Sequence, residues 1–292
     1  MKKKKANVFN VVVFAVLVLW TLVLIGLLLW AFFASVKEPL LDFRKNILGL
    51  PKEWKFSNYL YVYENFYIEI LNKQGFNEYV GMGQQIFNTM LFCIIRSGLG
   101  TFMPCLVGYL VAKYNYKFST VLYTGALIVM SLPIIGAYPA EISLLTSLGL
   151  YDTWLGVFFQ SSTYFGVYFF VFIASFTMIP NDFYDAASID GASDVKIFFR
   201  IMMPMVFTTI TTVFLLLFVA NWNEYQYALL YLPSKPTLSY GLYVLSNSPL
   251  QNLNNVPMRM SGCAIVMLPI LIVFIFLKEK LMSNISMGGL KE

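Results

Sequence analysis

Long stretches without a charged side chain dominate this chain and constrain its fold more than any other feature. A helix needs about 20 apolar residues to cross the hydrocarbon core of a bilayer. One stretch, Tyr79–Ala112, is apolar except for Arg96 near its middle. The uncharged stretches are Val8–Val36, Phe118–Ala140, Thr153–Asn181, Ile201–Asn223 and Met260–Leu277. The pattern predicts an all-α membrane protein with six transmembrane helices.

Composition excludes several other classes of protein. Charged residues make up 12% of the chain, about half of their share in soluble domains, and hydrophobic residues 59%. The net charge of +5 comes mostly from residues near the termini or between apolar stretches, unlike the basic stripe of a nucleic-acid-binding protein. Histidine is absent, and Cys93, Cys105 and Cys263 lie in apolar stretches without ligand-like spacing. We therefore expect buried packing for the cysteines, and no metal site, catalytic residues or cofactor on this chain.

Cationic residues in short loops predict the orientation in the membrane, because Lys and Arg accumulate on the cytoplasmic side. An even number of spans places both termini on the same side. If that side is the cytoplasm, the outer short loops carry only Lys235 and Arg259. The cytoplasmic side then carries Lys2–Lys5, Lys113, Lys117, Lys196, Arg200, Lys278, Lys280 and Lys291. Both termini are predicted to be cytoplasmic.

The first apolar stretch is too long for a signal peptide and no small-residue cleavage site closes it, so we interpret it as a retained helix. The predicted organisation has three parts. Residues 1–36 form the cytoplasmic N-terminus and the first span, and residues 37–84 form a long extracytoplasmic segment. Residues 85–292 form the core with spans two to six, an inner connection at 180–204 and a polar tail at 278–292. Aromatic residues in the outer segment indicate either an interfacial belt or a partner-docking surface.

The inner connection reads IPNDFYDAASIDGASDVKIFFRIMMP, from Ile179 to Pro204. Pro180 can begin a helix, and Asp182 lies where the helix dipole favours an acidic side chain. Ala187 and Gly191 are four residues apart, and the glycine also permits the chain to turn. The segment predicts a short helix, a glycine turn and a second helix on the cytoplasmic side, between spans four and five. Composition alone would also fit an ordinary amphipathic interfacial helix.

Spacing favours a more specific interpretation. The segment resembles the cytoplasmic loop signature of binding-protein-dependent ATP-binding-cassette importers, in which an acid and two alanines precede a glycine, and an apolar pair and a proline follow. The matching residues are Asp185, Ala186, Ala187, Gly191, Ile201, Met203 and Pro204. Aspartate replaces the usual glutamate at 185, and methionine the usual leucine at 203. The resemblance implies that this segment is the coupling helix that docks onto a cytoplasmic ATPase.

Further residues resemble the carbohydrate-uptake branch of these importers, related to the second permease of the maltose transporter. They are the FNTM of Phe87–Met90, the NWNEYQYALLYLP that begins at Asn221, and the terminal SNISMGGLKE. The resemblance implies a bacterial plasma-membrane permease for a sugar, namely a di- or oligosaccharide. It also implies a second homologous permease, two copies of an ATPase and an extracytoplasmic solute-binding protein as partners. The ATPases would bind ATP and Mg, since this chain has no GxxxxGK[ST] motif.

Polar residues in the fifth span predict a substrate pathway, because unpaired polar groups inside a membrane are costly. The cluster comprises Asn221, Trp222, Asn223, Glu224, Tyr225 and Gln226. Alternatively, these residues only stabilise the outer end of the span. Arg96 is expensive within a span unless it faces the bundle interior or meets an acid, for which Glu224 and Glu141 are candidates. A packing or pairing role for Arg96 and direct contact with substrate both remain open.

Two other functions compete with this reading. A secondary transporter would also carry polar residues within its spans, but the spacing from Asp185 to Pro204 would then be a coincidence. A membrane-embedded enzyme would need a catalytic set, and the absence of histidine and the scattered acids argue against it. Within the importer class, an amino acid, phosphate or metal ion competes with a sugar as the transported solute.

Overall fold

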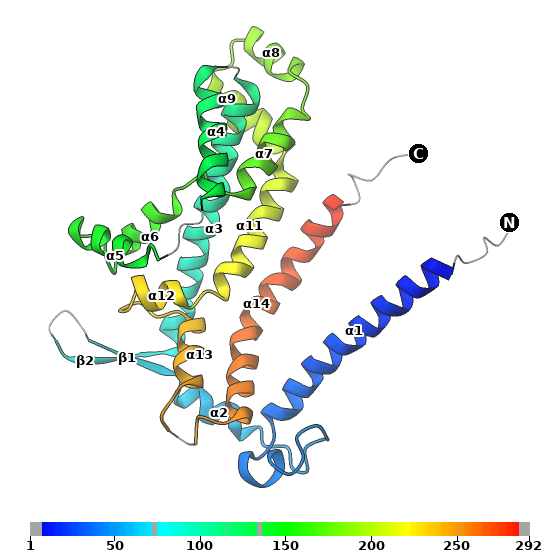
Figure 1. The fold of residues 1–292 in the computed structure, drawn as a ribbon, viewed down its shortest axis with the longest axis vertical. Coiled ribbons are helices and arrows are strands. Elements are labelled where there is room, and N and C mark those ends of the chain that lie inside the picture. Colours follow the sequence, from blue (N-terminus) through cyan, green and yellow to red (C-terminus); the bar gives the residue numbers. More distant parts are fainter. Residues whose placement is uncertain (1–7, 72–74, 115, 133–135, 251, 286–292) are drawn as a thin grey trace. The chain divides into compact units, whose positions relative to one another are not determined.

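The computed structural model describes residues 8–71, 75–114, 116–132, 136–250 and 252–285. Within these ranges the chain is mostly helical, as predicted (Figure 1). The sequence prediction of an all-α chain missed one small sheet, in which β1 (Tyr67–Leu71) pairs with β2 (Asn77–Gly81). Its strands alternate polar and apolar residues and bury Ile68 and Val80, the period expected of a strand. The chain then enters the second predicted span directly from β2.

The chain divides into two compact units. The first combines residues 1–67 with 241–269, and the second combines residues 68–240 with 270–292. The first unit contains α1 (Val8–Ser35), the π-helical turn η1 (Pro39–Phe43) and α2 (Ser57–Glu64), together with most of α13 (Leu238–Ser246). The long helix α14 (Val256–Ile285) begins in the first unit and ends in the second.

Apolar side chains of α1 are mostly exposed, including Phe14, Leu19 and Trp20. So many exposed apolar side chains on one helix indicate a helix that faces lipid rather than water. The end of α1 is fixed by hydrogen bonds at Ser35. Its carbonyl accepts from Asn58 Nδ2 of α2 at 2.8 Å and from Ser261 Oγ of α14 at 2.9 Å.

Lys37 follows α1 and is fully buried. Its ammonium donates to the backbone carbonyls of Asn46 at 2.5 Å and Gly49 at 2.6 Å, with the Ile47 carbonyl at 3.4 Å. A buried charge is tolerated only when hydrogen bonds compensate its lost hydration. Lys37 therefore gathers the loop at 46–49 around the end of the first helix.

The second unit is built around α3 (Met82–Lys113), which packs against α7 (Val167–Thr177) and α11 (Phe207–Trp222). Gly108 lets α3 and α7 approach closely, because a Cβ there would lie 2.9 Å from the Phe172 Cβ. The remaining helices of this unit are α4 (Lys117–Ser131), α5 (Tyr138–Ser147), α6 (Trp154–Ser161), α8 (Asp182–Ile189), α9 (Asp194–Ile197), the π-helical turn η2 (Phe198–Met202), α10 (Met203–Met205) and α12 (Gln226–Tyr231).

Three helical segments of the described chain are long and apolar enough to cross a membrane: α1, α3 and residues Val256–Ile275 of α14. Two bent pairs raise the number to five if each pair is one span. These are α7 with α8, bent by 71°, and the helical run Asp194–Met205 with α11, bent by 76°. The predicted stretch Phe118–Ala140 contains only the shorter α4 as a candidate. The structure therefore confirms a membrane fold with several helices. The number of six spans and the cytoplasmic location of the termini stay predictions.

One predicted span is interrupted. Within the uncharged stretch Thr153–Asn181, α6 ends at Ser161 and α7 begins only at Val167. Gly166 separates the two helices with φ of 136°, a backbone conformation that glycine adopts freely. An apolar composition indicates membrane compatibility but not helix continuity, so this break was not visible in the hydropathy pattern.

Candidate functional site

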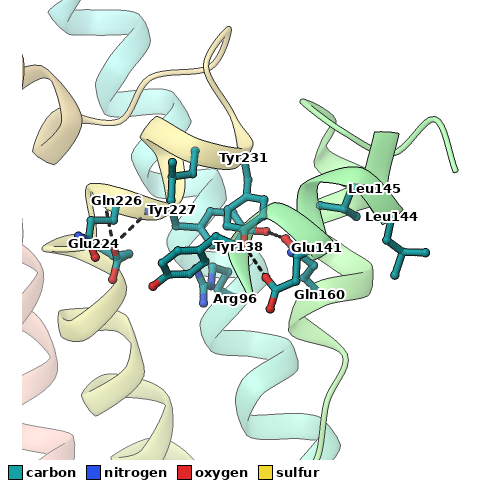
Figure 2. A pocket seen from close by; sticks show the side chains of 11 residues that line it. Arg96, Tyr138, Glu141, Leu144, Leu145, Gln160, Glu224, Gln226, Tyr227 and Tyr231 are labelled. Carbon is teal, nitrogen blue, oxygen red and sulfur yellow. Dashed lines mark hydrogen bonds between the residues drawn. The ribbon is translucent and has the colours of Figure 1, made fainter. Parts of the chain in front are cut away.

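A cavity of about 420 Å³ lies within the second unit (Figure 2). This volume falls in the range of about 300 to 1,000 Å³ that is usual for small-molecule sites. Its wall combines aromatic, charged and amide side chains from several helices. The lining residues are Arg96, Tyr138, Glu141, Leu144, Leu145, Gln160, Glu224, Gln226, Tyr227, Leu230 and Tyr231.

Arg96 enters the cavity from the middle of α3 and lies against an aromatic ring. Its Cζ is 4.1 Å from the centroid of the Tyr227 ring and 5.3 Å from that of Phe92. A desolvated cation over an aromatic face is stabilised by about 2 kcal/mol. The buried Nη1 of Arg96 has no hydrogen-bond partner among the described residues. Other atoms of the Arg96 side chain form part of the cavity wall.

Two acids lie on opposite sides of Arg96 in Figure 2. The Glu224 carboxylate accepts hydrogen bonds from the backbone N–H of Gln226 at 2.8 Å and of Tyr227 at 3.2 Å. Glu224 thereby caps the first turn of α12, where its charge is favourable. Glu141 on α5 accepts a hydrogen bond from the Tyr231 hydroxyl. Neither acid is within ion-pair distance of Arg96 in the described structure.

The tyrosines of α12 are held by each other and by a neighbouring helix. Tyr227 and Tyr231 are four residues apart on one face, with ring centroids 4.8 Å apart. The Tyr227 hydroxyl donates to the amide oxygen of Gln160 on α6. Tyr138 of α5 meets Tyr231 edge-on at 6.4 Å. Aromatic faces thus stand beside hydrogen-bonding groups, which suits a ligand with both apolar faces and hydroxyls.

The structure brings three of the predicted pathway residues, Arg96, Glu224 and Gln226, into the lining of this cavity. The other four lie outside its lining. Asn221 donates to Ser97 Oγ at 3.1 Å, and the indole of Trp222 is buried against Phe218. Asn223 is exposed and bonds the Val219 carbonyl, and Tyr225 is half-buried.

Sequence reasoning did not single out the lining residues Tyr138, Gln160, Tyr227 and Tyr231. Glu141 was considered only as a partner for Arg96. Tyr227 and Tyr231 lie four residues apart, on one helical face, shortly after Glu224. This spacing could have indicated that both tyrosines belong to the same site as Glu224.

The inner connection has the predicted helix, glycine turn and second helix. Helix α8 ends at Ile189, Gly191 follows with φ of 75°, and α9 begins at Asp194. Asp185, Ala186 and Gly191 are exposed, whereas Ala187 is buried. Exposed apolar side chains accompany them, with Ile189 85% and Phe183 48% exposed. Ile201 and Pro204 lie further on, in η2 and α10.

Residues 105–286 match the protein family described as "Binding-protein-dependent transport system inner membrane component". The chain belongs to this family. It is a transport permease subunit and a multi-pass membrane component, as the signature around Gly191 and the apolar stretches predicted. Family members work with a second permease, an ATPase and a solute-binding protein.

Relatives of this permease include transporters with named substrates. The arabinooligosaccharides transport system permease protein AraQ of Bacillus subtilis (strain 168) is 29% identical over 82% of this chain and 80% of that protein. The diacetylchitobiose uptake system permease protein NgcG of Streptomyces coelicolor is 22% identical over 96% of this chain and 88% of that protein. The melibiose/raffinose/stachyose import permease protein MelC of Bacillus subtilis is 24% identical, over 73% of this chain and 78% of that protein.

A solved structure has the same fold. It is the crystal structure of a bacterial ABC transporter involved in the import of the acidic polysaccharide alginate. The TM-score is 0.73 at 19% identity, over 96% of this chain and 98% of that chain. The likeness extends the fold beyond the residues that match the family, to nearly the whole permease.

Proposed function

We propose that this permease forms part of the translocation pathway for an uncharged di- or oligosaccharide in an ATP-binding-cassette importer. The observation that carries the proposal is the cavity around Arg96. Its aromatic rings can pack on sugar ring faces, while Arg96, Glu141 and Gln160 can bond hydroxyls as donors and acceptors. The names of the relatives, whose substrates are oligosaccharides, support the same class of solute.

The charges of the cavity favour an uncharged solute. The described lining residues include one arginine and two carboxylates. An acidic sugar would bring a further negative charge near Glu141 and Glu224, and like charges repel strongly at low dielectric. Hydroxyl groups, by contrast, can accept from a guanidinium and donate to a carboxylate without adding charge.

The residues around Gly191 are proposed to dock onto the ATPase. The docking segment comprises the positions that match the family signature, Asp185, Ala186, Ala187, Gly191, Ile201 and Pro204. Asp185, Ala186 and Gly191 are exposed for contact, whereas Ala187 packs in the core beneath them. Ile189 and Phe183 are both exposed beside the turn, and a group of exposed apolar side chains indicates a surface that a partner covers. ATP and Mg would bind to the ATPases rather than to this chain.

The full assembly would contain this chain, a second homologous permease, two ATPase copies and an extracytoplasmic binding protein in a bacterial plasma membrane. Six spans and cytoplasmic termini would place 37–84 outside and 180–204 with the tail 278–292 inside. The other fifth-span residues, Asn221, Trp222, Asn223 and Tyr225, would then support the pathway from outside the cavity lining. The competing proposal is an importer for a solute other than sugar.

Uptake into proteoliposomes tests the proposal. The complete complex is reconstituted with the ATPases facing the lumen. ATP is enclosed in the lumen, and the solute-binding protein is added outside the liposomes. Labelled arabinotriose, raffinose and diacetylchitobiose are offered separately, with phosphate, glutamine and an alginate trisaccharide as controls. We expect ATP-dependent uptake of at least one neutral oligosaccharide and none of the controls. Uptake of a control solute in place of every sugar would contradict the proposal.

A further inference from the structure

Helix α3 connects the two functional regions of the second unit. It carries Arg96 into the cavity, and its last residues lie beside α8 and α9 at the other end of the bundle formed by α3, α7 and α11 (Figure 1). A helix is stiff along its axis because its backbone N–H groups bond to the preceding turn, and between Arg96 and Lys113 only Pro104 lacks that donor. Any contact that fixes α8 and α9 to the end of α3 can therefore relay their displacement toward Arg96.

Lys113, the last residue of α3, makes one such contact. Its ammonium donates to the backbone carbonyl of Ile179 at 2.5 Å and to Oδ1 of Asn181 at 2.9 Å. Both acceptors lie between the end of α7 and the beginning of α8. The ammonium thus ties the end of α3 to the residues that lead into α8.

Tyr184 on α8 makes the second contact. Its hydroxyl donates to Oδ1 of Asp194 at 2.7 Å, which joins α8 to the first residue of α9 across the turn at Gly191. A hydrogen bond to a carboxylate is about twice as strong as one between neutral groups. This bond therefore holds the two short helices as one body.

Tyr184 also packs on the residue that follows α3. Its ring meets the Tyr114 ring edge-on, with centroids 5.8 Å apart, and the two hydroxyls are 3.4 Å apart. Tyr114 in turn meets Tyr109 of α3 edge-on at 5.8 Å. Burial raises the pKa of Tyr114, so its phenol stays protonated at physiological pH. A continuous series of contacts thus runs from Asp194 through Tyr184 and Tyr114 into α3.

We propose that Tyr184 and Asp194 are positioning residues that couple ATP hydrolysis to transport, because their hydrogen bond makes α8, α9 and the end of α3 move together. This inference rests on the proposed function of the chain as an importer permease. Neither residue touches solute in this account. Without the bond, α8 could follow the ATPase while α9 and α3 lag behind it, and hydrolysis would continue with little transport.

The test measures molecules of sugar imported per ATP hydrolysed, in proteoliposomes that contain the complete complex and the panel sugar with the greatest uptake. Tyr184→Phe keeps the ring and its packing but removes the donor, and Asp194→Asn removes the charge of the acceptor. Tyr116→Phe is the matched control, because this neighbouring tyrosine stacks on Tyr114 but its hydroxyl has no described hydrogen bond. Co-purification of the ATPase is measured for every variant.

We expect Tyr184→Phe and Asp194→Asn each to lower the ratio at least about tenfold, equivalent to about 1.4 kcal/mol of coupling. The double variant should be no worse than either single variant, because both remove the same bond. The control should match wild type, and all forms should retain the ATPase. An unchanged ratio, or equal loss of uptake and hydrolysis, would overturn the inference alone. Wild-type complex without ATP-dependent sugar uptake would overturn the proposed function as well.

Discussion

Arg96 lies with its guanidinium carbon 4.1 Å from the centre of the Tyr227 ring, and its Nη1 is buried without a described hydrogen-bond partner. The ring stabilises the charge without using its donors. An arginine paired with a carboxylate would have its donors occupied. This arrangement places a cation in the wall of the cavity without an ion-pair partner among the described residues.

Substitution of Tyr227 separates the two roles of this side chain. Tyr227→Phe keeps the ring over Arg96 and loses only the hydrogen bond to Gln160, which is worth about 1 kcal/mol. We expect the half-saturation concentration for uptake to rise about fivefold. Tyr227→Leu also removes the cation–π contact, worth about 2 kcal/mol, and should lower uptake at limiting sugar about 30-fold or more. Equal effects of the two variants in the proteoliposome assay would contradict this division of roles.

Substitution of Glu141 tests whether the transported solute is uncharged. Glu141→Gln can still accept the hydrogen bond from Tyr231 while removing one negative charge. For a neutral sugar, we expect uptake within about threefold of wild type. Glu141→Ala also leaves the hydroxyl of the buried Tyr231 without its acceptor. This loss costs about 1 to 3 kcal/mol and should reduce uptake at least tenfold. If Glu141→Gln were as defective as Glu141→Ala, the charge itself would be required, and a cationic solute would be favoured.

Substitution of Lys37 tests the loop that follows α1. Lys37→Met preserves much of the side-chain length but leaves the carbonyls of Asn46 and Gly49 without their donor. Each lost hydrogen bond from the charged ammonium costs about 1.5 to 3 kcal/mol, so we expect a clear fall in the thermal stability of the detergent-purified permease. Lys45→Met is the control, because Lys45 is exposed. Equal melting temperatures for the two variants would show that the buried ammonium does not hold the loop.

The parts that could be predicted from sequence are those whose structure is local. The helix, glycine turn and helix around Gly191 depend on residues within a few positions of each other, and the structure contains them. The membrane class followed from apolar stretches alone. Arg96 and Glu224 were recognisable because a charge in an apolar stretch is costly without a purpose.

The remainder of the candidate site depends on tertiary packing. Glu141, Gln160 and Tyr227 come from α5, α6 and α12, and no sequence pattern indicates that these helices meet. The break before Gly166 and the paired strands at 67–81 were also missed. In both cases the hydropathy of the segment was compatible with more than one backbone path, and packing against neighbours decided between them.

Gly191 offers the most direct test of the central claim that this permease is driven by an ATPase docked on the segment from Asp185 to Pro204. The residue has φ of 75°, and nothing lies within 4 Å of a Cβ placed there. Gly191→Ala therefore meets only backbone strain, about 1 kcal/mol. Gly191→Arg adds a long charged side chain to the exposed turn.

The measurement is co-purification of the ATPase with wild type, Gly191→Ala and Gly191→Arg, each scored for membrane insertion and for retention of the second permease. We predict that all three insert and keep the second permease, that wild type and Gly191→Ala retain the ATPase, and that Gly191→Arg loses it. Retention of the ATPase by Gly191→Arg would contradict docking at this turn, and failure of wild type to recruit an ATPase would contradict the account as a whole.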